Sequence, residues 1–253
     1  MKTDRLPFWL LDILVAGALL SRLPLPHLPE NAFIHTARAA WAYPVVGAVL
    51  GTLAGACGLA IMGLDLPAPF AAGGVLAALM LLTGAMHEDG LADTADGFWG
   101  GFDPARRLEI MKDSQIGTYG VLALLVVTGL RWVAYAALLP LGLLPVVVAA
   151  VLSRATMPCL MASVPNARNS GLSKSVGSPS MPIVATGVVI ALALAGLCVG
   201  VSAIMYLIMG LAVALLVGWL AMRKIKGQTG DVLGATQQLS ELAILGTMIA
   251  QMT

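Results

Sequence analysis

Residues 41–86 decide the fold, and they read WAYPVVGAVLGTLAGACGLAIMGLDLPAPFAAGGVLAALMLLTGAM. Two apolar runs, 41–64 and 68–86, are separated only by Asp65-Leu66-Pro67. A helix needs about 20 mostly apolar residues to cross a lipid bilayer, and proline suits a tight reversal. The stretch therefore predicts a helical hairpin that crosses a membrane twice.

Four further apolar runs repeat this pattern and form two more hairpins. The junctions Pro140-Leu141 and Gly200-Val201 leave almost no connecting loop. We therefore expect an all-α, polytopic transmembrane bundle with six clear spans plus N- and C-terminal apolar helices, in a single domain over residues 1–253. The four runs are 116–139, 141–162, 181–200 and 201–222; the shorter C-terminal run is 235–252, and residues 6–21 are expected to form a retained helix rather than a cleaved signal peptide.

The composition excludes an ordinary soluble protein. Hydrophobic residues make up 59% of the chain and charged residues 11%, whereas soluble domains have about 45–50% apolar and about 25% charged residues. A soluble helical protein would need polar helix faces at a period of 3.6, and a β-barrel would need alternating strands; the runs show neither. The formal net charge of +1 gives no field that would attract nucleic acid. We expect lipid, and no nucleic acid, as a partner.

The distribution of basic residues predicts the orientation. Nearly all lysine and arginine residues lie in the long connections, and none lies in the three tight reversals. Because cytoplasmic loops of membrane proteins carry an excess of Lys and Arg, the long loops are expected on the cytoplasmic face. The active-site loop is expected at about residues 87–115.

An acidic cluster follows the second apolar run. Asp89, Asp93 and Asp96 stand at i, i+4 and i+7, a spacing that places three carboxylates on one face of a helix, where they repel one another. Mg²⁺ relieves such repulsion and is commonly held by carboxylates, water and substrate phosphates. The alternative is a solvated acidic helix end. The clustering favours the metal site, because seven of the thirteen acids lie between residues 88 and 113. These seven are Glu88, Asp89, Asp93, Asp96, Asp103, Glu109 and Asp113.

The segment after the cluster adds cations and another carboxylate. Arg106 and Arg107 are suited to bidentate phosphate binding, and Lys112 lies nearby. The alternative is that these three residues anchor the loop to anionic lipid. Asp113 is placed to be a fourth metal ligand or to support the ligands.

A reacting hydroxyl would also need a proton acceptor. One of the clustered carboxylates is a candidate, and His87 and Glu88 are the candidates outside the ligand face. The alternative for His87 is a histidine at the membrane interface that bonds a backbone group.

Two arginines, Arg131 and Arg154, fall inside predicted spans, where an ionised side chain is costly. They either line a polar pocket or form a structural ion pair with Asp12 or Glu241, and we favour the ion pair.

Several segments resemble the cobalamin synthase family, whose members are adenosylcobinamide-GDP ribazoletransferases. The most specific are residues 87–97 (HEDGLADTADG) and 107–120 (RLEIMKDSQIGTYG). Residues 21–26 (SRLPLP), 43–47 (YPVVG) and 227–235 (GQTGDVLGA) resemble further segments of the family. The resemblance runs from end to end of the chain, so it is more specific than an isolated DxxxDxxD pattern.

The resemblance implies a Mg²⁺-dependent phosphoryl transfer in cobalamin biosynthesis. Adenosylcobinamide-GDP is joined to α-ribazole or its 5′-phosphate, which gives adenosylcobalamin or its phosphate and releases GMP. Corrinoid and nucleoside substrates are then the partners, and the bacterial cytoplasmic (inner) membrane is the location. Self-association and association with other cobalamin-assembly enzymes stay open. The resemblance adds Gln228, Thr229 and Asp231 as substrate-binding residues; without it, 227–234 would be a flexible inner loop.

Two other functions compete with this reading. A transporter would hold its carboxylates near mid-membrane in broken helices, whereas Asp89, Asp93 and Asp96 lie at a helix end beside a charged loop. The CDP-alcohol phosphotransferases also use an aspartate-rich motif, but here Asp89-Gly90 lacks the Ala-Arg pair of that group. An enzyme of the cobalamin synthase type therefore stays the primary hypothesis.

Overall fold

The computed structural model describes residues 7–34 and 36–252 of the chain as an all-α bundle, as predicted. Within these residues, the one bridge of extended backbone joins Asn166 to Gln228. The helices are α1 (Phe8–Leu20), η2 (Glu30–Phe33), η3 (Thr36–Ala42), α2 (Tyr43–Met62), α3 (Ala68–Thr83), α4 (Met86–Gly100), α5 (Pro104–Ile110), α6 (Thr118–Leu138), η4 (Leu139–Leu141), α7 (Leu144–Ser163), α8 (Leu172–Val176), α9 (Met181–Val199), α10 (Ser202–Ile225) and α11 (Gly230–Ala250).

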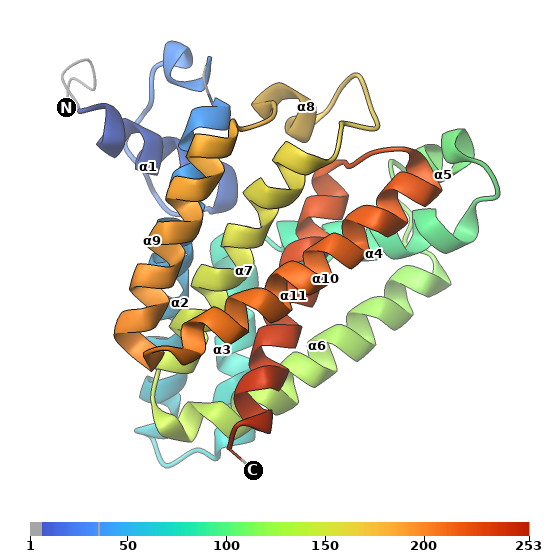
Figure 1. The fold of residues 1–253 in the computed structure, drawn as a ribbon. Coiled ribbons are helices and arrows are strands. Elements are labelled where there is room, and N and C mark those ends of the chain that lie inside the picture. The colour runs from blue at the N-terminus through green and yellow to red at the C-terminus, as the bar shows by residue number, and fades with distance from the viewer. Residues whose placement is uncertain (1–6, 35, 253) are drawn as a thin grey trace.

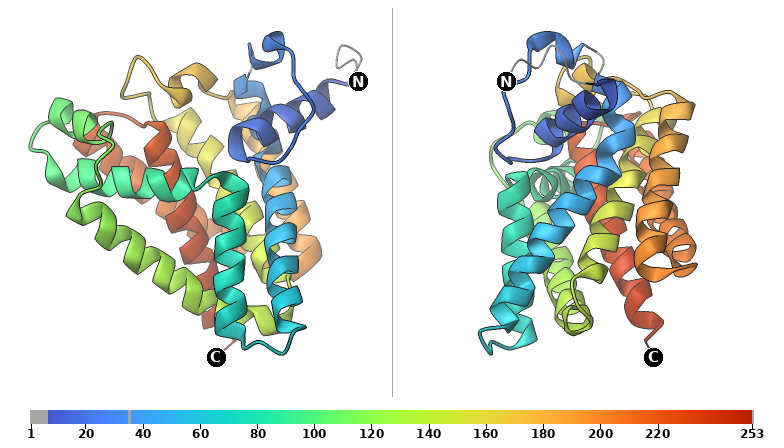
Figure 2. Two further views of the ribbon diagram at one scale, coloured as in Figure 1. Left: turned by 180° about the vertical axis from the view of Figure 1, so that it is seen from behind. Right: turned by 90° about the vertical axis from the view of Figure 1, so that its left-hand side faces the viewer.

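The three predicted hairpins are present, as α2 with α3, α6 with α7, and α9 with α10. Their tight reversals lie toward one end of the bundle and the long connections lie at the other end (Figures 1 and 2). Helix α11 runs back from the long-connection end, and the C-terminus lies at the end of the reversals (Figure 1). All the long loops therefore gather where a site can be built from them.

The helices fit a multi-pass membrane protein. Five of those described are long and apolar enough to span a bilayer, and a sixth span is counted when α3 and α4 are taken together. Large apolar side chains are exposed on the outside of the bundle, which suits lipid rather than water. Examples are Leu125, Val189, Leu197 and Leu215.

The second predicted span, 68–86, is shorter than expected because the chain bends sharply within it. Helix α3 ends at Thr83, and α4 begins at Met86 at an angle of 89° to α3. Gly84 (φ 66°) and Ala85 (φ 55°) both adopt left-handed backbone, which glycine tolerates and which strains Ala85. Much of the predicted active-site loop is thus helical: it holds α4, which crosses the bundle, and the short helix α5.

Glycines let α2 and α7 pack closely. Gly47, Gly51 and Gly55 repeat every four residues along α2 and face α7. A Cβ at Gly51 would lie 2.8 Å from Val147 Cα, and one at Gly55 would lie 2.8 Å from Leu143 Cβ. Small residues at this spacing drive helix contact in lipid, where the hydrophobic effect gives little help.

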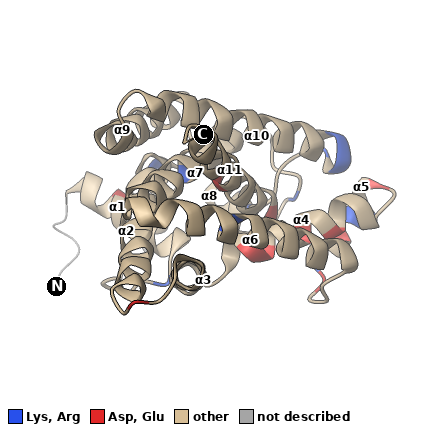
Figure 3. Cartoon of the chain, turned by 90° about the horizontal axis from the view of Figure 1, so that it is seen from below, with Lys and Arg blue, Asp and Glu red and all other residues tan. Residues whose placement is uncertain are grey.

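Charged residues are concentrated at the end of the bundle that holds the long connections. Asp and Glu residues lie along α4 and α5, and Lys and Arg residues lie on α5 and at the end of α10 (Figure 3). Those on α10 are Arg223 and Lys224. This arrangement matches the predicted separation of basic loops from tight reversals, and the assignment of this end to the cytoplasm stays a prediction.

Candidate functional site

The site is built where α4 crosses α11, and two glycines make the crossing possible. A Cβ at Gly90 would lie 2.7 Å from the carbonyl oxygen of Asp231, and a Cβ at Gly234 would lie 3.2 Å from His87 Cα. Two backbones approach this closely only where a side chain is missing. The crossing brings Asp231 beside the acidic residues of α4.

Three carboxylates converge at this crossing. Asp89 is exposed and Asp93 is half-buried. Asp93 lies close enough to Asp89 and to Asp231 for these carboxylates to repel one another. Burial raises the pKa of Asp231, with Asp89 adding to that rise and Arg168 opposing it. The repulsion predicted within α4 is therefore present, and a carboxylate from α11 adds to it.

Asp96 makes different contacts from the other predicted ligands. It is buried, and its carboxylate accepts hydrogen bonds from the backbone N–H groups of Gly117 (2.7 Å) and Gly120 (2.9 Å). A Cβ on either glycine would overlap this carboxylate. Asp96 thus holds the first turn of α6, where a negative charge also suits the helix dipole. Its role as a metal ligand stays a prediction.

One cavity collects several of the predicted residues. Asp89 and Asp93 line it from α4, and Lys112 and Asp113 line it from the segment between α5 and α6. We call it the acidic cavity. The Asp113 carboxylate accepts a hydrogen bond from the backbone N–H of Gln115 (3.1 Å). The structure therefore brings Asp113 into one cavity with Asp89 and Asp93, and its role as a fourth metal ligand stays a prediction.

The donor set of the acidic cavity fits Mg²⁺ bound together with substrate. Within residues 7–34 and 36–252, no three His, Cys, Asp or Glu side chains form a ready-made metal site. Mg²⁺ seldom needs one, because it commonly takes one or two carboxylates and completes its shell with water and substrate phosphates. Asp89 and Asp93, with mutual repulsion that a cation would relieve, provide that number.

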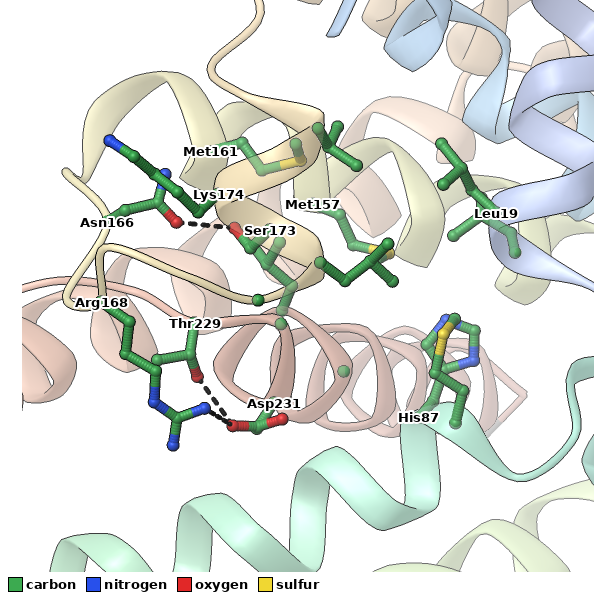
Figure 4. Close-up of a pocket in the computed structure, with 18 of the residues that line it drawn as sticks. Leu19, His87, Met157, Met161, Asn166, Arg168, Ser173, Lys174, Thr229 and Asp231 are labelled. Atoms are coloured by element: carbon green, nitrogen blue, oxygen red, sulfur yellow. Dashed lines mark hydrogen bonds and ion pairs between the residues drawn. The ribbon is translucent and has the colours of Figure 1, made fainter. Parts of the chain in front are cut away.

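A second pocket also has Asp89 in its lining, and we call it the amphipathic pocket. It is enclosed by α1, α4, α7, α8 and the start of α11 (Figure 4). At its polar side, Arg168 donates to the Asp231 carboxylate (3.2 Å), and the Thr229 hydroxyl donates to the same oxygen (3.1 Å). Asp89 lines both this pocket and the acidic cavity.

The residues of 227–231 are part of the site's framework. Thr229 caps α11 by accepting from the backbone N–H of Val232 (3.3 Å). Gln228 is buried and accepts from the Ser173 hydroxyl (2.8 Å). Asp231 and Thr229 line the amphipathic pocket, and Gln228 holds α8 over it. Direct contact of the three with substrate stays a prediction.

The two predicted phosphate-binding arginines differ in how they are used. Arg106 is exposed and pairs with Glu109 (2.7 Å). Arg107 donates to the carbonyl oxygens of Gly101 and Lys224, both at 2.9 Å, and so ties α5 to the end of α10. Lys112, by contrast, lies in the acidic cavity.

His87 and Glu88 face inward from the first turn of α4. His87 is buried and lines the amphipathic pocket, and its Nε2 has no hydrogen-bond partner among the described residues. Glu88 accepts from Arg131 (3.3 Å) and from the Gln238 amide (3.0 Å). Among the described residues, each side chain has one buried atom without a hydrogen-bond partner, Nε2 of His87 and Oε2 of Glu88, but of the two only His87 lines the amphipathic pocket.

A buried network of charges lies beneath the site. Arg131 pairs with Glu241 (2.6 Å) and with Glu88, and the Tyr135 hydroxyl donates to Glu241 (2.6 Å). Arg154 is buried beside them and donates to a backbone carbonyl of its own helix. The predicted ion pair of Arg131 with Glu241 is confirmed.

Asp12, the other predicted partner, is not part of this network. It accepts instead from Arg38 (2.9 Å) and from the Trp41 indole (3.0 Å). This pair fixes α1 to η3, which positions the part of α1 that lines the amphipathic pocket.

Comparisons with known proteins agree with the motifs. A family model described as "Cobalamin-5-phosphate synthase" matches residues 12–249. A Sinorhizobium protein named adenosylcobinamide-GDP ribazoletransferase is 42% identical over 249 residues, which cover 94% of this chain and 95% of the relative. Proteins of the same name from Bradyrhizobium diazoefficiens and Brucella anthropi are 43% identical (92% and 91% covered) and 41% identical (94% and 96% covered). No solved structure matches the chain.

Proposed function

The chain belongs to the cobalamin-5-phosphate synthase family, and from that premise we propose that it joins adenosylcobinamide-GDP to α-ribazole or α-ribazole 5′-phosphate in a Mg²⁺-dependent reaction. It is a transferase of cobalamin biosynthesis and a multi-pass membrane protein. The named substrates, the metal and the orientation in the inner membrane are the proposed part.

The proposed reaction is a phosphoryl transfer. A ribose hydroxyl of the nucleoside attacks the phosphorus that carries the cobinamide. A new P–O bond forms, the P–O bond to the GMP phosphate breaks, and GMP leaves with the electron pair. The proton of the hydroxyl passes to an acceptor on the protein. The products are adenosylcobalamin or its 5′-phosphate, and GMP.

The acidic cavity provides what a diphosphate requires. Asp89 and Asp93 are positioned to hold Mg²⁺, and Lys112 and Asp113 face them from across the cavity. Mg²⁺, when bound there, neutralises charge on the diphosphate and helps to orient the attacking hydroxyl. Lys112 adds a cation for the phosphate oxygens.

The positions of the side chains reduce the number of candidate proton acceptors. Glu88 accepts from Arg131 and Gln238 at one carboxylate oxygen and lines neither the acidic cavity nor the amphipathic pocket, so it is poorly placed to receive a proton from substrate. His87, with an unpartnered Nε2, and the carboxylates of Asp89 and Asp93 remain as candidates. All three side chains lie on α4 at the crossing with α11.

One observation supports this function most strongly: Asp89 lines both the acidic cavity and the amphipathic pocket. A transferase with two substrates needs its reacting groups to meet at one place. The two cavities offer separate places for the diphosphate of the donor and for the acceptor, and Asp89 lines both. Basic loops at this end of the bundle support a cytoplasmic site.

The test is GMP release by purified protein supplied with GDP-cobinamide, α-ribazole and Mg²⁺. We expect GMP from the wild type, none after chelation of the metal, and a loss of most activity in Asp89→Asn, Asp93→Asn and Asp96→Asn while each variant still inserts into the membrane. A loss on the order of 100-fold or more is typical for a group that stabilises transition-state charge. Full activity in all three variants would remove the proposed metal site.

Two further substrates distinguish the competing functions in the same preparation. Release of CMP from a CDP-alcohol would identify a phospholipid-type synthase. Uptake of substrate into vesicles without GMP release would identify a transporter.

A further inference from the structure

The amphipathic pocket has two chemically different sides. Figure 4 places Asn166, Lys174, Arg168, Thr229 and Asp231 on one side, and Leu19, Met157, Met161 and His87 on the other. We propose that this pocket binds the acceptor nucleoside, with its base against the apolar side and its ribose, phosphorylated or not, toward Lys174 and Arg168. The proposal rests on the proposed function and assigns one of its two substrates to a place.

The apolar side suits a base with few polar atoms. Met157 and Met161 come from α7 and are buried, and Leu19 comes from α1. Methionine sulfur makes favourable contacts with aromatic rings and adapts to their shape. The fused bicyclic benzimidazole of α-ribazole has an apolar outline that can lie against such a wall.

A guanine base fits this side poorly. Its edge carries several donors and acceptors, and burying them without partners is costly. Near Met157 and Met161, Figure 4 labels two polar side chains: Ser173, whose hydroxyl already donates to Gln228, and His87, which has a single unpartnered nitrogen among the described residues. The apolar side therefore favours the nucleoside acceptor over the guanosine of the donor.

The polar side suits an anionic or hydroxyl-rich group. Lys174 is exposed on α8, and within the described part of the chain it takes part in no ion pair. Arg168 pairs with Asp231, yet its Nε has no partner among the described residues. Lys174 is thus free to bind a 5′-phosphate with a charge-assisted hydrogen bond, and Arg168, which Asp231 and the carbonyl oxygen of Leu108 hold in place, adds positive charge on the same side.

The helix that carries Lys174 is held in place by contacts on both sides. The Ser173 hydroxyl donates to Gln228, and the Thr36 hydroxyl donates to the carbonyl oxygen of Val176 (3.2 Å). Helix α8 is therefore fixed to the segment just before α11 and to η3, and Lys174 has a defined position over the pocket. Asp89 then separates this pocket from the acidic cavity, where the diphosphate is proposed to bind.

Two lysines provide a matched test, one for each cavity. Lys174→Gln is expected to raise the KM for α-ribazole 5′-phosphate about tenfold, because one charge-assisted hydrogen bond is lost, while the KM for unphosphorylated α-ribazole and for GDP-cobinamide stays within about twofold. Lys112→Gln in the acidic cavity is expected to raise the KM for GDP-cobinamide and to leave that for the nucleoside unchanged. Met157→Ala is expected to raise the KM for both nucleosides about tenfold.

Direct binding separates this proposal from the reaction itself. Calorimetric titration of detergent-solubilised protein with α-ribazole 5′-phosphate, without GDP-cobinamide, should show weaker binding in Lys174→Gln than in the wild type. Binding that depends on Lys174 in a protein that releases no GMP would keep the subsite and reject the reaction. The opposite result is also possible to recognise. If the protein releases GMP, and Lys174→Gln and Met157→Ala change only the KM for GDP-cobinamide or change no KM, the subsite is rejected and the reaction is kept.

Discussion

Glu88 and Asp89 are neighbours in sequence, but they belong to two groups of charges that the protein treats differently. Glu88 joins a buried network in which two guanidinium groups, of Arg131 and Arg154, lie with two carboxylates, of Glu88 and Glu241. Asp89 joins carboxylates that repel each other beside open cavities. Where charge is balanced within the protein, its role is to hold the fold. Where carboxylates lack a matching cation within the protein, a ligand must supply the positive charge.

The largest effect is expected from breaking the buried network. Arg131→Met would leave Glu241 and Glu88 buried without their cation, and removing one partner of a buried pair costs about 3–5 kcal/mol. We expect a large fall in the free energy of unfolding, measured by denaturant titration in micelles. Asp93→Asn, at the open cluster, should retain the wild-type stability and lose activity instead.

A double variant controls for the loss of the arginine side chain itself. Arg131→Met combined with Glu241→Met removes one charge of each sign and should recover part of the lost stability, because an apolar pair can replace a buried ion pair. Arg131→Met as stable as the wild type would show that the network does not hold the bundle.

The next largest effect is expected at the crossing of α4 with α11, which brings Asp231 beside Asp89. Gly90→Ala would place a Cβ 2.7 Å from the Asp231 carbonyl oxygen and 3.0 Å from its Cα. Backbone atoms cannot move aside as a side-chain end can, so we expect a loss of about 1–3 kcal/mol in stability. Moving Asp231 away from Asp89 should also lower the rate of GMP release.

A glycine further along α11 provides the control for this change. A Cβ at Gly246 meets nothing within 4 Å, and alanine is the better helix former by roughly 1 kcal/mol. Gly246→Ala should therefore leave activity unchanged and stability equal or higher. Equal behaviour of the two alanine variants would contradict the close approach of α4 to α11.

Asp96 sharpens the comparison, because its spacing groups it with Asp89 and Asp93 whereas its hydrogen bonds hold the first turn of α6. If its main role is to hold α6, Asp96→Asn should lower the free energy of unfolding by about 0.5–2 kcal/mol, the range for loss of a helix cap. Its activity would then fall without a change in the Mg²⁺ concentration required for half-maximal rate. Asp89→Asn should raise that concentration and leave stability unchanged. An Asp96→Asn protein of normal stability with a raised Mg²⁺ requirement would make Asp96 a ligand.

The sequence predicts the hairpins well because each span is a property of a local run of residues. Apolar length and tight reversals were enough to place α2, α6, α7, α9 and α10 within a few residues. The bend after α3 was not predicted, because Ala85 adopts left-handed backbone without any signal in its residue type. An apolar run that continues through Gly84 gives no indication of where the helix turns.

The candidate site was predicted only in part because its geometry is tertiary. The i, i+4, i+7 spacing identified the carboxylates of α4, but Asp96 turns to α6 because Gly117 and Gly120 admit its carboxylate. Asp231 was linked to substrate by resemblance, and its place beside Asp89 depends on a crossing of helices more than 100 residues apart in the chain. The sequence signals for this crossing were Gly90 and Gly234, but a glycine alone does not indicate which residue packs against it.

The smallest effect is expected at the exposed arginine of α5. Arg106 pairs with Glu109 at the surface, and exposed pairs contribute little to stability because water and salt screen them. Arg106→Gln should leave the melting temperature unchanged, whereas Arg107→Gln should lower it, since Arg107 joins α5 to α10 through two backbone carbonyls. Kinetics then decide between phosphate and lipid binding for Arg106: a raised KM for GDP-cobinamide in detergent would assign it to substrate, and weaker binding to anionic vesicles with an unchanged KM would assign it to lipid.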